Sequence, residues 1–258
     1  MTAPNGISII LRHAHLGVLK TERIDVAVLP WGATEAHNFH LPYGTDIMES
    51  EHIAAASANA AAARGARVIV LPTMPFGVNT GQLDIPFTIN MNPTTQFHVL
   101  KDVVSSLEGC GVPKLVILNS HGGNDFRQMI REIQPQTRIF LCTANWYRCL
   151  DLKEYFDQPG DHADEMETSV MLHIAPKDVL PLDQAGEGKE RKLRIEAFRQ
   201  GWAWTPRQWT KATADTGVGD PRKASAAKGE KYFNEVTARV GRFLHELATT
   251  AAEDMYEL

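Results

Sequence analysis

The sequence predicts an α/β fold in which helices cover both faces of a mostly parallel central sheet, giving three α/β/α layers. Short, continuously apolar runs alternate along the chain with longer segments of helical composition. The apolar runs lack the apolar–polar alternation of a half-solvated sheet, so each strand is expected to be buried on both faces. No linker or repeat interrupts this pattern, and residues 1–258 are therefore expected to form one domain.

The elements are expected in a regular order along the chain. A strand is predicted over residues 25–29, and Pro30 is expected to end it. An alanine-rich helix is predicted over 47–64, with Gly65 as its C-terminal cap. Further strands are expected at 68–71, 115–118 and 138–143, and further helices at 93–107, 126–133, 165–174 and 224–252. Residues 75–92 are irregular with a short β-segment expected at 87–91, and residues 186–219 show no clear pattern.

The bulk composition excludes several classes of protein. The chain is 43% hydrophobic and 22% charged, which is typical of a globular domain. Its net charge is −5 and basic residues do not cluster, so neither nucleic acid nor a membrane surface is an expected partner. No apolar run approaches the ~20 residues that span a bilayer, and the first residues do not resemble a signal peptide. Three cysteines without a CxxC pattern predict reduced thiols in a cytoplasmic protein.

Side chains that bind metal ions gather directly after two of the predicted strands. Glu35 and His37 follow the first strand, Asp46 comes nine residues later, and His121 follows the third strand. Ligands of parallel sheets bind beyond the carboxyl ends of the strands, so these side chains are expected to meet. Imidazole with carboxylate suits Zn²⁺, Mn²⁺ or Fe²⁺. A further cluster of acidic residues lies at 161–169. The N-terminus of a helix would favour these carboxylates, but it does not explain the histidine in the same cluster.

Four segments resemble sequence blocks of the creatininase family. Residues 29–46 (LPWGATEAHNFHLPYGTD) are similar to the pattern PxGxxExHGxHLPxxTD, and residues 119–124 (NSHGGN) to an NGHGGN-type turn. Residues 162–169 (HADEMETS) resemble HAGExETS, and residues 216–229 resemble a GVxGDPxxAxxxKG block. The blocks occur in the family's order, so the resemblance implies a creatininase-like fold over most of the chain.

The resemblance implies a centre of two divalent ions, Zn, Mn or Fe, bridged by Asp46. It implies one ion held by Glu35, Asp46 and His121 and a second held by His37, Asp46 and Glu167. Creatininases that act on creatinine take a carboxylate for the second ion from a His-Tyr-Glu-Asn turn. In this chain Gly123 occupies the position of the Glu in that turn and has no carboxylate. Glu167 is therefore expected to supply the carboxylate for the second ion. Three carboxylates balance most of the charge of two divalent ions, as a buried site requires.

The resemblance also implies the chemistry. His162 corresponds to a catalytic histidine that passes a proton to the leaving group. The implied substrate is a small cyclic amide, linear amide or formamide, and creatinine itself is not expected because of the His-Gly-Gly-Asn turn. One alternative is the opening of a cyclic sugar-like or cyclitol ketone by C–C cleavage. Another is a non-catalytic protein that binds metal or a small ligand. The family further implies a homo-oligomer, a hexamer.

Other residues are given more modest roles. Three departures from the family pattern are expected to reshape the substrate pocket: Asn38, Phe87 and Asp164. His40 is expected to brace its loop, and the sequence leaves open whether Asp161 orients His162. Surface positions are expected for His13 and His15, and core positions for Trp146, Trp202, Trp204 and Trp209.

Overall fold

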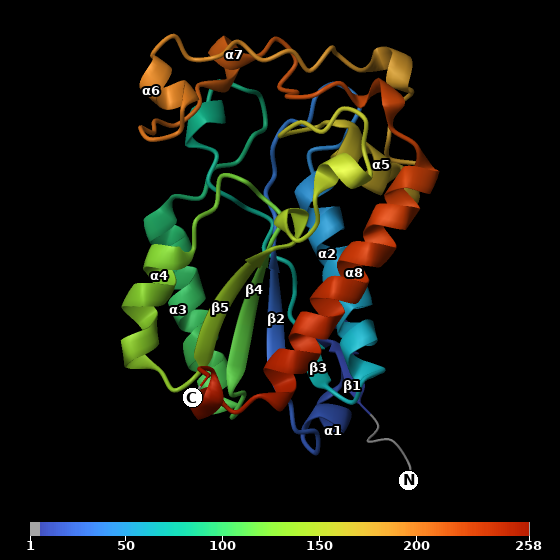
Figure 1. Cartoon of the computed structure of the whole chain (residues 1–258). Helices are drawn as coiled ribbons and strands as arrows, with labels where there is room; N and C mark the ends of the chain where they lie inside the picture. Colours follow the sequence, from blue (N-terminus) through green and yellow to red (C-terminus); the bar gives the residue numbers. More distant parts are fainter. Residues whose placement is uncertain (1–5, 258) are drawn as a thin grey trace.

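The computed structural model describes residues 6–257 and is built around a five-stranded, wholly parallel sheet in the order β1-β3-β2-β4-β5 (Figure 1). The strands are β1 Ile7–Ile10, β2 Val26–Trp31, β3 Arg67–Val70, β4 Lys114–Asn119 and β5 Phe140–Asn145. The helices are α1 Leu16–Leu19, α2 Thr45–Ala62, α3 Pro93–Gly109, α4 Arg127–Ile133, α5 Glu165–Ile174, α6 Glu196–Arg199, α7 Trp209–Ala212 and α8 Ala226–Thr249. The expectations that concern residues 1–5, including the start of the predicted domain and of the N-terminal segment, lie outside the described residues.

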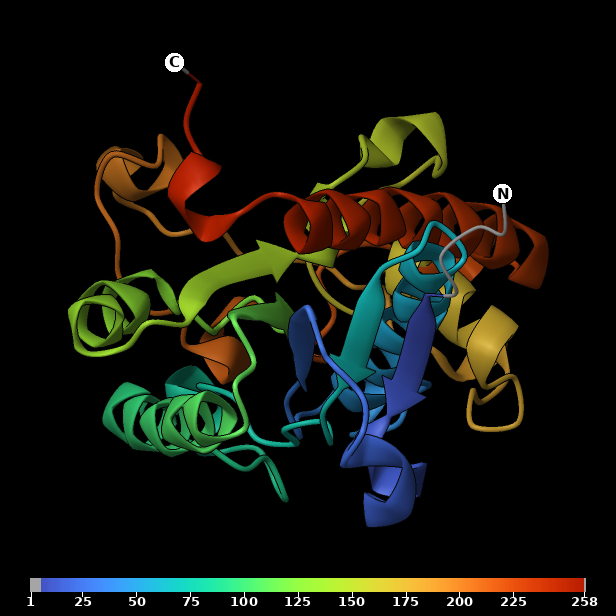
Figure 2. The same cartoon turned by 90° about the horizontal axis from the view of Figure 1, so that it is seen from below.

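The predicted three-layer arrangement is confirmed. Alternate side chains of β2 enter two separate hydrophobic clusters, with Val26 and Val28 on one face and Ala27 and Leu29 on the other. The first cluster includes side chains of α2, α5 and α8, and the second includes those of α3 and α4. Figure 2 shows α8 and α3 on opposite sides of the sheet. No helix of residues 6–257 is both long and apolar enough to cross a membrane.

The structure corrects several of the expected boundaries. Pro30 does not end β2, which continues to Trp31 in register with β4. Met74 N donates to Pro30 O, so the nitrogen of Pro30 faces the side where β3 has already ended and no ladder hydrogen bond is lost. The helix expected from residue 47 begins at Thr45, which places Asp46 in its first turn. Gly65 follows this helix with φ +100°, as a C-terminal cap requires.

Three further expectations also change. The strand β1 was not predicted, since four residues at a sheet edge carry little pattern. The β-segment expected at 87–91 consists only of isolated bridges at Ile89 and Asn90. Trp202 and Trp204 are 76% and 82% exposed and are not core residues, whereas Trp146 is buried. Residues 186–213, which include α6 and α7, cover the edge of the sheet at which the strands end (Figure 1).

The long helix α8 packs closely against α2 and α5. A Cβ atom at Gly229 of α8 would collide with the backbone of Ser169 in α5, so this glycine permits the close approach.

We expect Gly229→Ala to lower the free energy of unfolding by about 1–3 kcal/mol, as overpacking does elsewhere. Denaturant unfolding measures this. Gly109→Ala is the matched control, because its Cβ would meet open space, and a Gly229→Ala protein as stable as that control would contradict the packing argument.

Candidate metal centre

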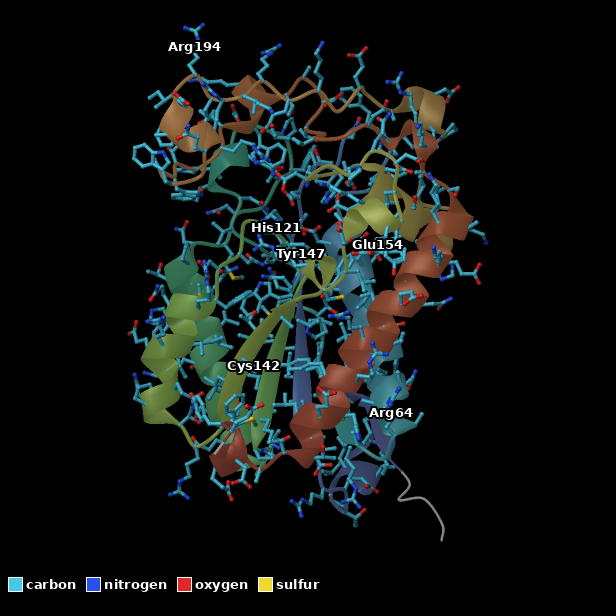
Figure 3. The ribbon with its side chains drawn as sticks, in the orientation of Figure 1. Arg64, His121, Cys142, Tyr147, Glu154 and Arg194 are labelled. Carbon is cyan, nitrogen blue, oxygen red and sulfur yellow. The ribbon has the colours of Figure 1, made fainter. Side chains whose placement is uncertain are left out.

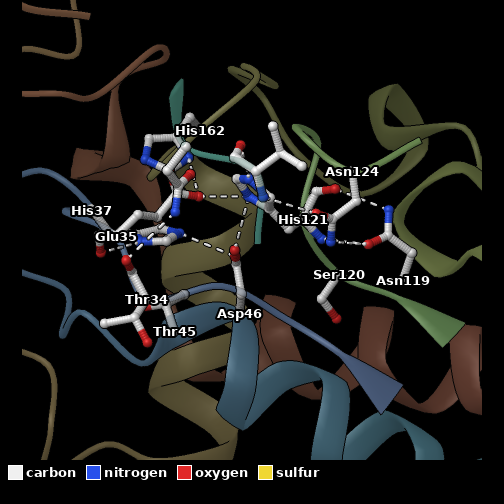
Figure 4. Close-up of polar contacts among 12 residues, drawn as sticks. Thr34, Glu35, His37, Thr45, Asp46, Asn119, Ser120, His121, Asn124 and His162 are labelled. Carbon is white, nitrogen blue, oxygen red and sulfur yellow. Dashed lines mark hydrogen bonds and ion pairs between the residues drawn. The ribbon is translucent and has the colours of Figure 1, made fainter. Parts of the chain in front are cut away.

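Four short stretches, each after a strand or at the start of a helix, bring the predicted ligands together. Figure 4 shows four of these ligands, Glu35, His37, Asp46 and His121. Glu35 and His37 lie in the loop after β2, and Asp46 lies in the first turn of α2. His121 follows β4 directly, and Glu167 lies in the first turn of α5. All five side chains are buried. In Figure 3, His121 lies inside the molecule, above the ends of the strands.

One group of possible ligands joins the loop after β2, helix α2 and the turn after β4. His121 Nδ1 lies 2.7 Å from Glu35 Oε1 and 3.1 Å from Asp46 Oδ2. These three atoms converge closely enough to hold a single ion. Helix α2 directs the positive end of its dipole at Asp46, which favours a carboxylate there.

A second group uses the other oxygen of Asp46. His37 Nε2 lies 3.2 Å from Asp46 Oδ1 and 4.0 Å from Glu167 Oε2. The two groups therefore share Asp46 through different oxygens, as the two predicted ligand sets do. A third possible group combines Glu35 and His37 with His162, so geometry alone also permits His162 to act as a ligand.

Backbone carbonyls orient all three imidazoles. His37 Nδ1 lies 3.1 Å from Glu35 O, His121 Nε2 lies 3.0 Å from Val78 O, and His162 Nε2 lies 2.9 Å from Ala36 O. A carbonyl oxygen only accepts hydrogen bonds, so each of these nitrogens carries the proton. The opposite nitrogen of each ring then faces the carboxylate cluster, where a bound metal ion would take its lone pair, an arrangement typical of histidines that bind metal.

The buried charges of the first group support one another. Burial alone would raise the pKa of the Glu35 and Asp46 carboxyls, but the facing histidines hold the pKa of both below its usual range. Burial alone would lower the pKa of His37 and His121, yet the carboxylates beside them raise the pKa of each ring, most strongly that of His121. Without metal, protons on the imidazoles therefore balance these carboxylates.

Glu167, the other carboxylate of the second group, lacks such compensation. Burial and the carboxylates of Glu49 and Asp46 raise the pKa of Glu167 well above its usual value. Burial and Asp46 do the same to the pKa of Glu49, whose two oxygens have no hydrogen-bond partner among residues 6–257. Asp46 Oδ2 likewise accepts no well-aligned hydrogen bond there. A cation between Asp46 and Glu167 would supply the missing positive charge, so these residues fit a bound divalent ion.

The turn after β4 cannot supply a carboxylate to the second group, and Glu167 supplies one from α5 instead. A Cβ atom at Gly123 would collide with Val78 O and the ring of His121, so that position accommodates no side chain. Asp164 caps α5, with Oδ1 accepting from Met166 N at 2.9 Å and Glu167 N at 3.1 Å. The carboxylate of Asp164 therefore caps the first turn of α5 and fixes the position of Glu167.

His162 lies beside the cluster, with its Nδ1 4.0 Å from Glu35 Oε1. Its ring centroid is 4.2 Å from that of His37 and 4.7 Å from that of Trp209. Burial, followed by the charge of His37, lowers the pKa of His162. A neutral imidazole that is held by Ala36 O and faces the cluster with a free lone pair can accept a proton there and deliver it elsewhere.

The structure also places the residues whose roles the sequence left open. Asp161 is bound by Arg207 at 2.8 Å and makes no hydrogen bond to His162. Glu165 pairs with Lys228 away from the cluster. His40 donates to or accepts from Thr168 Oγ1 at 2.8 Å and so braces its loop against α5, as expected. His13 and His15 are exposed, also as expected.

Two of the departures from the family pattern adopt left-handed backbone conformations. Asn38 has φ 55° and Phe87 has φ 61°, both uncommon for residues other than glycine. The side chain of Asn38 fastens its loop to the later chain, since its Oδ1 accepts from Gly186 N at 2.8 Å. Phe87 is 87% exposed on the segment that faces the site. Thr216, also left-handed at φ 64°, accepts from Asn38 N at 2.9 Å.

Several contributors to the site were not found in the sequence. Gln82, which is buried, donates to Glu35 Oε2. Glu49 lies one turn beyond Asp46 on α2. Trp209, expected in the core, instead lies against His162 from α7, with the two ring planes tilted by 58°. Glu49 offered a weak signal, as an acid spaced to share a helix face with Asp46. The others come from segments without regular periodicity.

A buried carboxylate and imidazole cluster beyond the ends of a parallel sheet, with a further histidine beside it, is typical of a metal-dependent hydrolase. The family model Creatininase, described as creatinine amidohydrolase, matches residues 17–244. The chain belongs to the creatininase family, and it is a metal-dependent amidohydrolase.

Comparison with individual proteins gives the same family at different distances. A Bacteroides fragilis structure provisionally described as a creatinine amidohydrolase is 42% identical, with a TM-score of 0.90 and full coverage of both chains. A creatininase structure in its manganese form is 17% identical with a TM-score of 0.76 over 95% of this chain and 100% of that one, and shows the shared fold. The mycofactocin precursor peptide peptidase of Mycobacterium ulcerans is 29% identical over 219 residues, 81% of this chain and 80% of its own. The 3-dehydro-scyllo-inosose hydrolase of Thermotoga maritima is 26% identical over 170 residues, 61% and 53% of the two chains.

Proposed function

We propose that the protein hydrolyses the C–N bond of an amide at a centre of two divalent ions. The observation that carries this proposal is the sharing of Asp46 between two ligand groups, one with Glu35 and His121 and the other with His37 and Glu167. Bound there, two divalent ions would polarise the substrate carbonyl and activate a water molecule. The relatives described as peptidases cleave an amide bond, which supports C–N rather than C–C hydrolysis.

The chain's own residues supply the proton transfer. His162 Nδ1 has its lone pair directed towards Glu35, because Nε2 is occupied by Ala36 O. A proton leaves the attacking water, is taken up at Nδ1 and passes to the departing nitrogen, while the hydroxyl oxygen joins the carbonyl carbon and the C–N bond breaks. Ala36 O and the adjacent rings of His37 and Trp209 keep the imidazole in place during both transfers.

Metal removal tests the proposal. We expect about two equivalents of Zn or Mn per chain, loss of hydrolysis of a panel of cyclic amides, linear amides and formamides after chelation, and recovery when metal is returned. A panel of oxidised cyclitols, run in parallel, tests C–C cleavage, which the Thermotoga maritima relative supports. Amide hydrolysis that survives chelation would contradict the proposal. A metal-loaded protein inactive on both panels would favour the non-catalytic alternative.

Metal loading is also expected to release protons at pH 7. The pKa values of His121 and Glu167 are raised in the site without metal, so each group keeps its proton to a higher pH than the free side chain does, and a bound cation must displace that proton. Lowering the pH favours the protonated form, and metal affinity should therefore fall as the pH falls. Calorimetric titration with Zn²⁺ in buffers of different ionisation enthalpy measures the release. A binding enthalpy independent of the buffer would contradict it.

A further inference from the structure

A cavity of about 320 Å³ is lined by two residues that lie next to His162 or to the carbonyl that holds it. Its lining includes Trp209, whose ring lies 4.7 Å from that of His162. It also includes Thr216, whose hydroxyl donates at 3.2 Å to Ala36 O, the carbonyl that holds His162 Nε2. The cavity is therefore adjacent to the proton-transferring residue, and its volume suits a small organic group.

Arg191 is the cation of this cavity. Within residues 6–257, no carboxylate oxygen lies within 4.0 Å of its guanidinium to form an ion pair. The acid on the same wall, Asp84, already accepts from Thr210 Oγ1 at 2.5 Å, and the positive charge of Lys211 acts on it as well. The remaining walls include the apolar side chains of Ile85 and Pro86.

Arg191 also borders a second cavity, of about 520 Å³, and the acids there are largely engaged. Glu190 lies 3.2 Å from Arg207. Asp215 accepts from the backbone N–H of Gly188 at 2.9 Å and of Gly217 at 3.0 Å. Lys189 is a further cation on the same lining and offsets Glu187. Arg191 thus retains a positive charge available to an anion.

The position of His162 determines which part of the substrate meets this cavity. In the proposed reaction His162 gives its proton to the departing nitrogen, so the amine part of the amide must lie on its side of the site. On that side Trp209 lies against His162 and also lines the cavity that includes Arg191.

Resting on the proposed amide hydrolysis, we propose that Arg191 and Trp209 form a subsite for a free carboxylate carried by the amine part of the substrate. The substrate class is then an amide of an amino acid, in which an acyl group is attached to an amino acid or to the last residue of a peptide. Arginine suits this role because its planar guanidinium donates two parallel hydrogen bonds to a carboxylate. Trp209 and the apolar wall would contact the side chain of that amino acid.

The subsite is tested by comparing the binding of two probes to zinc-loaded protein. N-acetyl-L-leucine carries a carboxylate, and N-acetyl-L-leucinol is uncharged because a hydroxyl replaces the carboxylate. We expect the carboxylate probe to bind about 10- to 100-fold more tightly by calorimetry, the range for a hydrogen bond to a charged group. Arg191→Gln should abolish this preference without changing the affinity for N-acetyl-L-leucinol, and Arg191→Lys should restore part of it. The matched control is Arg194→Gln, an exposed arginine of the same segment whose side chain points away from the site (Figure 3).

The outcomes separate the subsite from the reaction. Equal binding of the two probes by the wild type would overturn the proposal, as would a preference that survives Arg191→Gln. A preference that survives the substitution but disappears on chelation would place the carboxylate on the metal ions and would also overturn it. Release of leucine or leucinol is measured separately. An Arg191-dependent preference without release of either amine would support the subsite and count against the proposed hydrolysis.

Discussion

Asp46→Asn is expected to empty both metal positions and to reduce turnover at least about 10³-fold. Two metal ions that stabilise the transition state contribute several kcal/mol, and this contribution would be lost. Each oxygen of Asp46 faces a different histidine, His121 at 3.1 Å and His37 at 3.2 Å. The amide that replaces the carboxylate has one oxygen and no charge, so it cannot hold both ions. Elemental analysis of the purified variant measures the loss.

Asp102→Asn is the control for this substitution, because Asp102 is an exposed aspartate on α3, on the other face of the sheet. It should retain the metal content and activity of the wild type. Thermal unfolding should show that Asp46→Asn remains folded, since the change is isosteric. Two tightly bound equivalents in Asp46→Asn would show that Asp46 does not bridge the ions.

His162→Asn is expected to leave the metal content unchanged and to slow turnover by about 10²- to 10⁴-fold, the usual contribution of a general acid–base group. The pKa of His162 is lowered by burial and by His37, so the ring is neutral at pH 7 and ready to accept a proton at Nδ1. Activity that depends on this neutral ring should fall only at a pH below the usual histidine pKa of 6.5. Steady-state kinetics as a function of pH measures both effects.

His40→Asn serves as the comparison, because His40 is a buried histidine of the same region that bonds Thr168 and is absent from all three ligand groups. It should keep most of its turnover. Loss of one metal equivalent from His162→Asn would instead make His162 a ligand, as its grouping with Glu35 and His37 allows. Full activity with both metals present would remove it from the mechanism.

Much of the fold follows from local pattern. The apolar runs at 26–29 and 115–118 predict two central strands because side chains buried on both faces must all be apolar. The same pattern places Glu35, His37 and His121 at one edge of the sheet. The edge strand Ile7–Ile10 has too few residues and too little burial to give such a signal.

The orientation of the site could not be predicted in the same way. The carbonyls of Glu35, Val78 and Ala36 hold the three imidazoles, and any amino acid carries a carbonyl. Residues 186–213 lack periodicity because they pack on other loops, not on a sheet. The exposure of Trp202 and the contact of Trp209 with His162 therefore depend on the tertiary structure, which composition does not record.

Helix α8, which packs on both α2 and α5, is synthesised after the proposed metal ligands on those two helices. Asp46 and Glu167 are 121 positions apart, and the helix that clamps their two helices together spans Ala226–Thr249. A chain emerging from the ribosome thus presents its first ligands long before the element that fixes their geometry has been made. We therefore expect tight binding of the proposed ions only after α8 has been made. We also expect the shape of the site and the metal supply to select among divalent ions, since intrinsic affinity favours the metals late in the first transition row.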